Sequence, residues 1–198
     1  MKASILFSGG KDSSLSAILM EPFFDVELVT CTFSTIPTGE IAKKAADELG
    51  FKHRILNLDK SILEDAFKLI VEDGYPKNAI NHIHQKAIET LASDPDVEII
   101  ADGIRRDDRV PLLNISQIRS IEDRFKVHYA CPLRGYGRSA VNKMVEQHLQ
   151  IEEGQSEHII KADYETELRE IIRQRIGDEK VKEIFPSHVQ SQIVKRIK

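Results

Sequence analysis

Short apolar runs alternate with segments of helical periodicity over the first three quarters of the chain. The runs are bounded by Gly, Pro and polar residues and predict five strands, at 3–7, 25–33, 54–58, 97–101 and 126–130. Helical spacing of apolar residues occurs between them, in 15–20, 38–49, 61–73, 80–91, 115–121 and 138–149. This order is typical of a parallel sheet covered on both faces. The predicted fold class is α/β, doubly wound, with a mostly parallel five-stranded sheet.

The pattern changes after Leu149. It predicts a turn at 152–154, an edge strand at 157–161, and helices around 168–176 and 189–197. We therefore divide the chain into a main α/β domain at 1–150 and a small, mainly helical C-terminal appendage at 151–198 without a separate core. Earlier in the chain, Ser61 and Glu64 have the spacing of a capping box, which predicts a helix start there.

Four segments that are candidates for ligand binding or catalysis directly follow predicted strands, at 8–13, 32–33, 102–103 and 131–132. Parallel strands end at a common edge of their sheet, and ligands of open α/β sheets bind beyond the carboxyl ends of the strands. We therefore expect these four segments to lie along one rim and to form the functional site.

The segment FSGGKDSS, residues 7–14, joins the first strand to the first helix. Such a turn directs backbone N–H groups and the positive end of a helix at one spot, which predicts a phosphate site. The spacing excludes a Walker A loop, because Ile5 stands where that motif needs glycine and Asp12 where it needs Ser or Thr. A carboxylate next to a phosphate-binding lysine, Lys11, indicates Mg²⁺, which takes carboxylate and phosphate oxygens together.

Residues Ser8 to Ser13 resemble the SGGxDS pyrophosphate loop of the PP-loop superfamily. These are the N-type ATP pyrophosphatases, or adenine nucleotide alpha hydrolases, which have a HUP-like fold. The resemblance covers about residues 1–150 and implies ATP and Mg²⁺ as cofactors. It also implies cleavage to AMP and pyrophosphate, and an adenylated acceptor that then receives sulfur or nitrogen. The residues that it implies in ATP binding are Ser8, Gly9, Gly10, Lys11, Asp12, Ser13, Thr32, Phe33, Asp102 and Gly103.

Within that set, the resemblance gives Lys11 and Asp12 a catalytic role at the departing pyrophosphate. Relatives contact adenine with backbone groups at the position of Thr32 and Phe33. The alternative for Phe33 is a plain core residue.

The loop at 102–111 carries six charges in ten residues immediately after a predicted buried strand. Asp102-Gly103 with Asp107-Asp108 resembles the DGxNxDD stretch of the pincer-cofactor sulfur transferases, although Arg105 replaces the asparagine. We expect Asp102 to bind magnesium or ribose, and the arginines to bind an anionic acceptor substrate or the α-phosphate. These arginines are Arg105, Arg106 and Arg109. The alternative is a solvated loop of mutually paired charges.

Cys131 ends the fifth predicted strand, so its side chain is expected at the same rim. A thiol there could be catalytic by carrying sulfur or by forming an adduct, with Arg134 lowering its pKa. The following Pro-Leu resembles the sulfur-transferase branch, in which Ser usually precedes the proline. The alternative is a small core residue at a strand end.

Two further segments are ambiguous. His82 and His84 lie two apart on a predicted helix, a spacing that puts them on different faces and argues against a chelated metal. The polar residues of 185–191 either face the rim or simply begin a helix capped by Ser187.

Composition adds the cellular setting. The chain has 198 residues, a formal net charge of −4 and two cysteines without a Cys-x-x-Cys pair, which favours the reducing cytoplasm. It shows neither a spanning apolar run nor a signal-peptide layout, so no membrane partner is expected.

Arginines concentrated in the second half permit a tRNA acceptor, as in the tRNA thiolation branch; a small-molecule acceptor is the other possibility. Sulfur or ammonia would come from a donor protein. Rival functions are an ammonia-dependent amidating ligase and a non-catalytic ATP- or AMP-binding regulator.

Overall fold

The computed structural model describes residues 1–197 and contains the predicted parallel sheet. The sheet has five strands in the order β3-β2-β1-β4-β5, all paired in parallel. They are β1 (Lys2–Leu6), β2 (Asp25–Thr32), β3 (Lys52–Asn57), β4 (Ile99–Ala101) and β5 (His128–Ala130). The fold class is therefore as predicted. β4 and β5 are shorter than their apolar runs because only three residues of each pair in the sheet.

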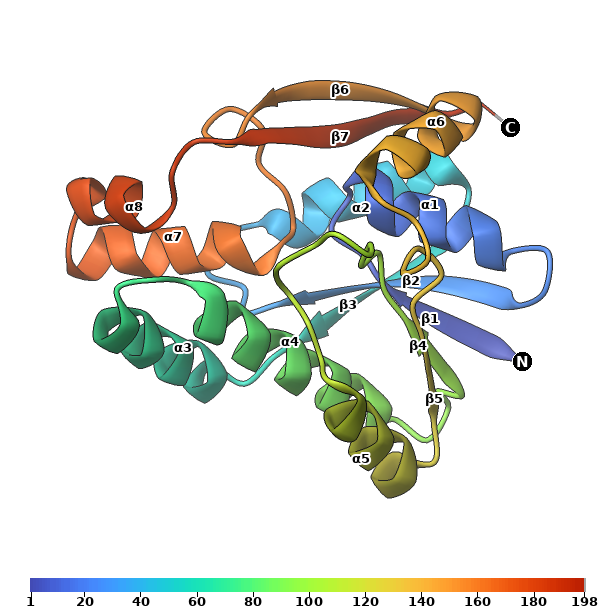
Figure 1. The fold of residues 1–198 in the computed structure, drawn as a ribbon, viewed down its shortest axis with the longest axis horizontal. Coiled ribbons are helices and arrows are strands. Elements are labelled where there is room, and N and C mark those ends of the chain that lie inside the picture. The colour runs from blue at the N-terminus through green and yellow to red at the C-terminus, as the bar shows by residue number, and fades with distance from the viewer. Residues whose placement is uncertain (198) are drawn as a thin grey trace.

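Helices cover both faces of the sheet (Figure 1). One face carries α1 (Lys11–Met20), α2 (Thr38–Leu49) and α6 (Arg138–His148). The other carries α3 (Lys60–Asp73), α4 (Lys77–Ala92), α5 (Ile115–Phe125) and α7 (Tyr164–Arg175), with α8 (Asp178–Ile184) packed beside α7. Each face has its own buried apolar cluster, and side chains such as Ile5 and Ile100, on opposite faces, are completely buried. Burial on both faces explains why the strand sequences are continuously apolar.

The C-terminal part contains an antiparallel pair of strands, β6 (Leu149–Gln155) and β7 (Val189–Arg196). The prediction of a helix at 189–197 is therefore wrong. In β7 buried Ile193 is followed by exposed Val194, and β-branched residues of this kind suit a strand once a partner is available. The predicted turn at 152–154 lies inside β6, and the predicted edge strand at 157–161 is instead the end of a turn followed by irregular chain.

The predicted start of α3 is also corrected. Asp59 is the N-cap, and its carboxylate accepts the Ser61 N–H at 2.8 Å. Asp59 takes the capping role that the sequence spacing assigned to Ser61 because α3 begins at Lys60.

The C-terminal part shares the cores of the sheet domain. Leu168 and Ile172 of α7 belong to the cluster under α3 and α4, while Ile193 of β7 belongs to the cluster over α1 and α2. In Figure 1, β6 and β7 run across the α1–α2 side of the molecule. No helix within residues 1–197 is long and apolar enough to cross a membrane.

The strand order places a crevice between β1 and β4. The chain leaves these neighbouring strands toward opposite faces, so their carboxyl ends form the switch point at which α/β sheets bind ligands. The glycine turn after β1 and the charged loop after β4 meet there.

Candidate functional site

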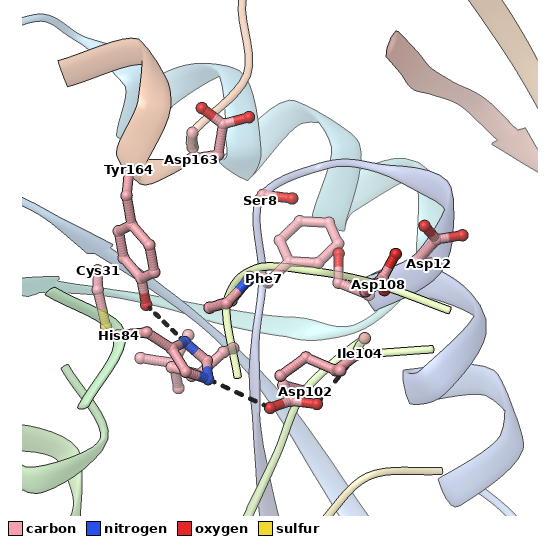
Figure 2. A pocket seen from close by; sticks show the side chains of 16 residues that line it. Phe7, Ser8, Asp12, Cys31, His84, Asp102, Ile104, Asp108, Asp163 and Tyr164 are labelled. Atoms are coloured by element: carbon pink, nitrogen blue, oxygen red, sulfur yellow. Dashed lines mark hydrogen bonds and ion pairs between the residues drawn. The ribbon is translucent and has the colours of Figure 1, made fainter. Parts of the chain in front are cut away.

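A two-part cleft lies over this switch point. The inner part has a volume of about 190 Å³ and a largely apolar lining that includes Phe7, Val29 and Tyr164. The outer part is larger, about 630 Å³, and is lined by charged and polar side chains. The two parts share the lining residues Ser8, Asp12, Asp108, Pro111, Asp163 and Tyr164. Figure 2 shows the inner part between the first turn of α1 and the start of α7.

The glycine turn after β1 lets other groups approach its backbone closely. Gly9 has φ 79°, a conformation that favours glycine, and Gly10 is the N-cap of α1 without a side-chain cap. A Cβ on Gly103, in the loop after β4, would lie 2.6 Å from the backbone nitrogen of Ser13. Glycine at 103 therefore lets the β4 loop pack directly against the first turn of α1.

Two amines converge on this turn. Lys11 is the first residue of α1, is 9% exposed, and its Nζ lies 4.0 Å from Glu153 Oε1 on β6. Lys161 comes from the C-terminal part, and its Nζ lies 3.4 Å from the point where a Gly10 Cβ would stand. The neighbouring Ala162 N–H donates to the Ser8 carbonyl at 3.1 Å. The turn, the two amines and the uncapped end of α1 make an arrangement that suits an anion, although Glu153 lies 4.0 Å from the Lys11 amine and Asp163 lies 3.9 Å from that of Lys161.

Asp12 carries an oxygen that fits a cation. Its Oδ1 is buried and lacks a hydrogen-bond donor within residues 1–197, while Oδ2 lies 3.7 Å from Arg105 Nε. Burial raises the pKa of Asp12 above its usual value, and the charges of Lys11 and Arg105 oppose this shift. In the described chain no three His, Cys, Asp or Glu side chains gather as a metal cluster. Mg²⁺ suits such a site, because it commonly takes one or two carboxylates plus phosphate oxygens and water.

Asp102 does not have the geometry expected of a magnesium ligand. Its Oδ1 accepts the Ile104 N–H at 3.0 Å, and its Oδ2 accepts the Tyr129 hydroxyl and lies 3.4 Å from His84 Nε2. The Tyr164 hydroxyl in turn lies 3.5 Å from His84 Nδ1 (Figure 2). Asp102 is thus engaged in a buried polar chain, and we correct its metal assignment. With Gly103 it lines the inner part of the cleft.

The backbone at the end of β2 is also occupied. The Phe33 N–H donates to both carboxylate oxygens of Glu167 on α7 at 3.0 Å, and the Thr32 hydroxyl donates to Glu167 Oε1 at 3.0 Å. The Thr32 carbonyl accepts the Leu58 N–H at 2.8 Å. Because these groups are bonded within the protein, they are not free for adenine as the resemblance implied. Phe33 is 2% exposed and is a core residue.

The three loop arginines differ. Arg105 lines the outer cleft, but its backbone N–H and its Nε donate to the Asp108 carboxylate at 2.7 and 3.1 Å, so the alternative of paired charges describes it. Arg106 and Arg109 are exposed and, within residues 1–197, lie outside the lining of both cleft parts. Arg106 lies against Gly137, where a Cβ would be 2.9 Å from its Nη2.

Cys131 lies next to the buried polar chain, outside the lining of either cleft part as described. Burial and the Asp102 carboxylate raise the pKa of Cys131 to about 12, although Arg134 acts in the other direction. Arg134 does act to lower this pKa, as expected, but the pKa is raised overall because desolvation outweighs one exposed cation. Cys31 is buried, and its pKa is likewise raised to about 12 by burial.

Sequence reasoning missed one wall of the cleft. This wall comes from the C-terminal part and from the start of α6, and its polar members are Arg138, Lys161, Asp163, Glu165, His188, Gln190 and Ser191. Of the two interpretations of residues 185–191, the one in which polar residues face the rim is correct for His188, Gln190 and Ser191, which line the cleft. A local sequence pattern could not pair these residues with Gly10, because the approach depends on the long-range pairing of β6 and β7.

Known proteins similar to this chain include tRNA-modifying ones. The crystal structure of a predicted subunit of a tRNA methyltransferase from Methanocaldococcus jannaschii has a TM-score of 0.90 and 40% identity, and covers 100% of this chain and 98% of that one. The tRNA-specific 2-thiouridylase MnmA of Syntrophomonas wolfei is 27% identical over 89% of this chain and 59% of its own. The U34-tRNA thiolase NcsA of Methanococcus maripaludis, solved with a 4Fe–4S cluster, shares the fold with a TM-score of 0.54 and 13% identity over 93% of this chain and 70% of that one.

A family match spans nearly the whole chain. Residues 1–195 match the family described as "Family of unknown function (DUF7411)". The chain belongs to this family.

Proposed function

We propose that the protein binds ATP with Mg²⁺ across the two-part cleft and cleaves it to AMP and pyrophosphate, adenylating an acceptor. The observation that carries this proposal is the unpartnered Asp12 Oδ1 beside the glycine turn and the uncapped start of α1. A buried carboxylate oxygen without a donor would repel a phosphate bound on its own. A cation bound to the phosphate would instead be coordinated by that oxygen.

The β- and γ-phosphates bind at the turn of Ser8, Gly9, Gly10 and Ser13. The amines of Lys11 and Lys161 flank them and stabilise the charge that develops on the departing pyrophosphate. Asp12 holds the magnesium ion, which neutralises phosphate charge when bound. In this proposal residues 1–150 form the ATP-binding domain, and Lys161 from the appendage 151–198 completes it.

The adenosine occupies the inner part. A planar base suits the apolar lining of Phe7, Val29 and Ile104, and Asp102 and Gly103 lie beside it. The α-phosphate then lies where the two parts meet, at Ser8 and Asp12, and faces the outer part. An acceptor in the outer part can approach the α-phosphorus, which matches pyrophosphate as the leaving group.

The similarity to a tRNA 2-thiouridylase favours sulfur transfer to tRNA over the alternatives of a small-molecule acceptor or nitrogen transfer. Arg106 and Arg109 are exposed cations that could contact such an acceptor beyond the cleft. A non-catalytic ATP- or AMP-binding regulator is the second candidate. The observation that favours it is that Arg105 is already paired with Asp108, so this arginine is less available to bind an acceptor or the α-phosphate.

Titration of the protein with ATP and magnesium tests the proposal. We expect binding that depends on magnesium, and loss of that dependence in Asp12→Ala. With an acceptor present, Lys11→Ala should lose about 10²- to 10³-fold in turnover, the usual effect of removing one electrostatic contact to the transition state. Lys44→Ala, at an exposed lysine of α2, is the matched control and should behave as the parent. Magnesium-independent binding in the parent would contradict the proposal.

A further inference from the structure

Glu165 has a carboxylate oxygen without a partner in the outer cleft. The residue lies in the first turn of α7, lines the outer part, and its side chain is 20% exposed. Its Oε1 accepts Arg169 Nε at 2.8 Å and lies 2.7 Å from Arg169 Nη2. Its Oε2 makes no hydrogen bond within residues 1–197 and is not among the covered polar atoms that lack a partner there. This second oxygen is therefore accessible, and the outer cleft is the cavity that its side chain lines.

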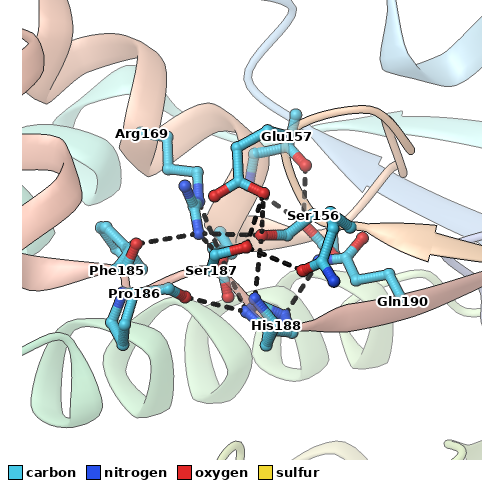
Figure 3. Close-up of polar contacts among 12 residues, drawn as sticks. Ser156, Glu157, Arg169, Phe185, Pro186, Ser187, His188 and Gln190 are labelled. Carbon is cyan, nitrogen blue, oxygen red and sulfur yellow. Dashed lines mark hydrogen bonds and ion pairs between the residues drawn. The ribbon is translucent and has the colours of Figure 1, made fainter.

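Arg169 holds the Glu165 carboxylate in one orientation. Its Nη2 donates to the Phe185 carbonyl at 3.2 Å and to Ser156 Oγ at 3.4 Å, and its guanidinium lies 5.2 Å from the centre of the Phe185 ring. Figure 3 shows the arginine between Phe185 and Ser156. Because Ser156 follows β6 and Phe185 follows α8, two further segments fix the arginine that fixes Glu165.

The other acids that line the outer part are engaged. Both oxygens of Asp108 accept from Arg105. Asp163 caps α7 through Oδ1, and its Oδ2 lies 3.9 Å from Lys161 Nζ. The remaining acid is the carboxylate that the proposed function assigns to magnesium. Among the lining acids that the structure describes, Glu165 is thus the one free to act on a bound acceptor.

The surroundings of Glu165 favour proton uptake. Burial, and next the negative charge of Asp163, raise the pKa of Glu165 above its usual value, while Arg169 and His188 act in the opposite direction. Asp163 and Arg169 face the carboxylate from α7, and His188, whose Nδ1 lies 3.9 Å from Oε1, faces it from the segment before β7. A carboxylate with a raised pKa is a stronger base, and a base is most effective when its pKa approaches the operating pH.

Its place in the chain puts Glu165 on the acceptor side of the cleft. The preceding Asp163 and Tyr164 line both parts, whereas Glu165 lines the outer part in the described structure. The proposed function places the α-phosphate where the two parts meet and the acceptor in the outer part. With about 630 Å³ against 190 Å³ for the inner part, the outer part can hold an acceptor group as well as the pyrophosphate.

We propose that Glu165 is the general base of the acceptor step, and that the acceptor attacks through an O–H or N–H group. The oxygen or nitrogen of that group forms a bond to the α-phosphorus. The bond between the α-phosphorus and the oxygen that bridges to the β-phosphate breaks, and pyrophosphate leaves with its electron pair. Glu165 Oε2 takes the proton of the attacking group. The inference rests on the proposed function, because it needs ATP to be cleaved at the α-phosphorus in this cleft.

Hydrolysis of ATP to AMP and pyrophosphate, with water as the acceptor, tests the inference. Water has an O–H group and ionises only at a pKa of about 15.7, so the pH dependence of the rate reports groups of the protein. Glu165→Gln keeps an oxygen for Arg169 but removes the base. It should lower the rate about 10²- to 10⁴-fold above the Glu165 pKa, and leave the affinity for ATP with magnesium unchanged. Because the base acts in its ionised form, the ratio of parent to variant rate should fall about tenfold per pH unit below that pKa.

Glu170→Gln is the matched control. Glu170 lies on the same helix, is 22% exposed and pairs with Arg173 at 2.6 Å, but it is outside the described lining of the outer cleft. This variant should match the parent in rate and in pH dependence. Glu165→Ala with added formate is the second variant if the glutamine protein does not fold. Formate can take the position of the lost carboxylate, so it should restore part of the turnover in this variant and leave the parent rate unchanged.

Four results would overturn the inference: an unchanged rate in Glu165→Gln, an equal loss in Glu170→Gln, a rate ratio that does not vary with pH, or no rescue by formate. Failure of the proposed function is seen in the parent, as binding of ATP without release of AMP and pyrophosphate, and would overturn both. A parent that releases both products, with Glu165→Gln doing so at the same rate, fails only the inference.

Discussion

Glu167 binds the hydrogen-bond donors at the carboxyl end of β2. Its carboxylate is 1% exposed and accepts from the Thr32 hydroxyl, the Phe33 N–H and both the N–H and the hydroxyl of Thr35. Glu167→Gln turns one accepting oxygen into a donor facing these donors. We expect the free energy of unfolding to fall by about 1–3 kcal/mol, measured by urea denaturation. Glu48→Gln, at an exposed position of α2, should change it little, and equal effects of the two variants would contradict this role.

Asp12 should show opposite effects on stability and on binding. Burial raises its pKa in the folded state, so its ionised form opposes folding above the usual aspartate pKa. Asp12→Asn should therefore raise the melting temperature of the ligand-free protein at neutral pH while abolishing magnesium-dependent ATP binding. The gain should vanish as the pH falls below the usual aspartate pKa, where both proteins are uncharged at this position. A lower melting temperature at neutral pH would show that the pairing with Arg105 outweighs burial.

Cys131 should behave as an unreactive thiol. Its pKa of about 12 leaves little thiolate at neutral pH. In a Cys31→Ser background, the rate of alkylation should rise about tenfold per pH unit up to about pH 10. A plateau below that pH would mean a low-pKa thiolate and would restore the catalytic role that the sequence suggested.

At the scale of elements, the contact between the β4 loop and α1 positions the glycine turn after β1. A Cβ at Gly103 would meet the Ser13 nitrogen at 2.6 Å and the Asp12 carbonyl carbon at 2.8 Å, both of them backbone atoms. Gly103→Ala should therefore displace the start of α1, lower the free energy of unfolding by about 1–3 kcal/mol and weaken ATP binding. Gly135→Ala is the matched control, because no described atom lies within 4 Å of its Cβ position. Equal stability of the two variants, with unchanged ATP binding, would contradict this packing.

The elements that sequence periodicity predicts well are those with local causes. The buried runs of β1 and β2 and the amphipathic helix Thr38–Leu49, which ends at Gly50, could be predicted because burial on both faces and a left-handed glycine cap leave clear marks. β7 could not be predicted, because its alternation of buried and exposed residues is short. Its partner strand β6 is also distant in the sequence, beyond α7 and α8. The strand character of β7 depends on tertiary pairing.

At the scale of the whole molecule, the site joins local and distant parts of the chain. The glycine turn and Asp12 were predictable, since strand, turn and helix are contiguous in the sequence. Lys161 and Gln190 were not, because β6 and β7 carry the C-terminal part back over α1 and α2 (Figure 1). The link is direct: the Ile193 N–H of β7 donates to the Gly9 carbonyl at 3.3 Å. The C-terminal part is therefore a wall of the site as well as part of the shared core.

The central claim is that ATP is split between its α- and β-phosphates. Its most direct test is to incubate the protein with magnesium, candidate RNA acceptors, sulfide as the sulfur source that displaces AMP, and ATP radiolabelled at the γ-phosphate, and to separate the products by thin-layer chromatography. Attack at the α-phosphorus predicts that the label appears in pyrophosphate, that AMP forms in equal amount, and that both disappear in Lys11→Ala. Label in inorganic phosphate with ADP as the nucleotide product would place the reaction at the γ-phosphate and contradict the account.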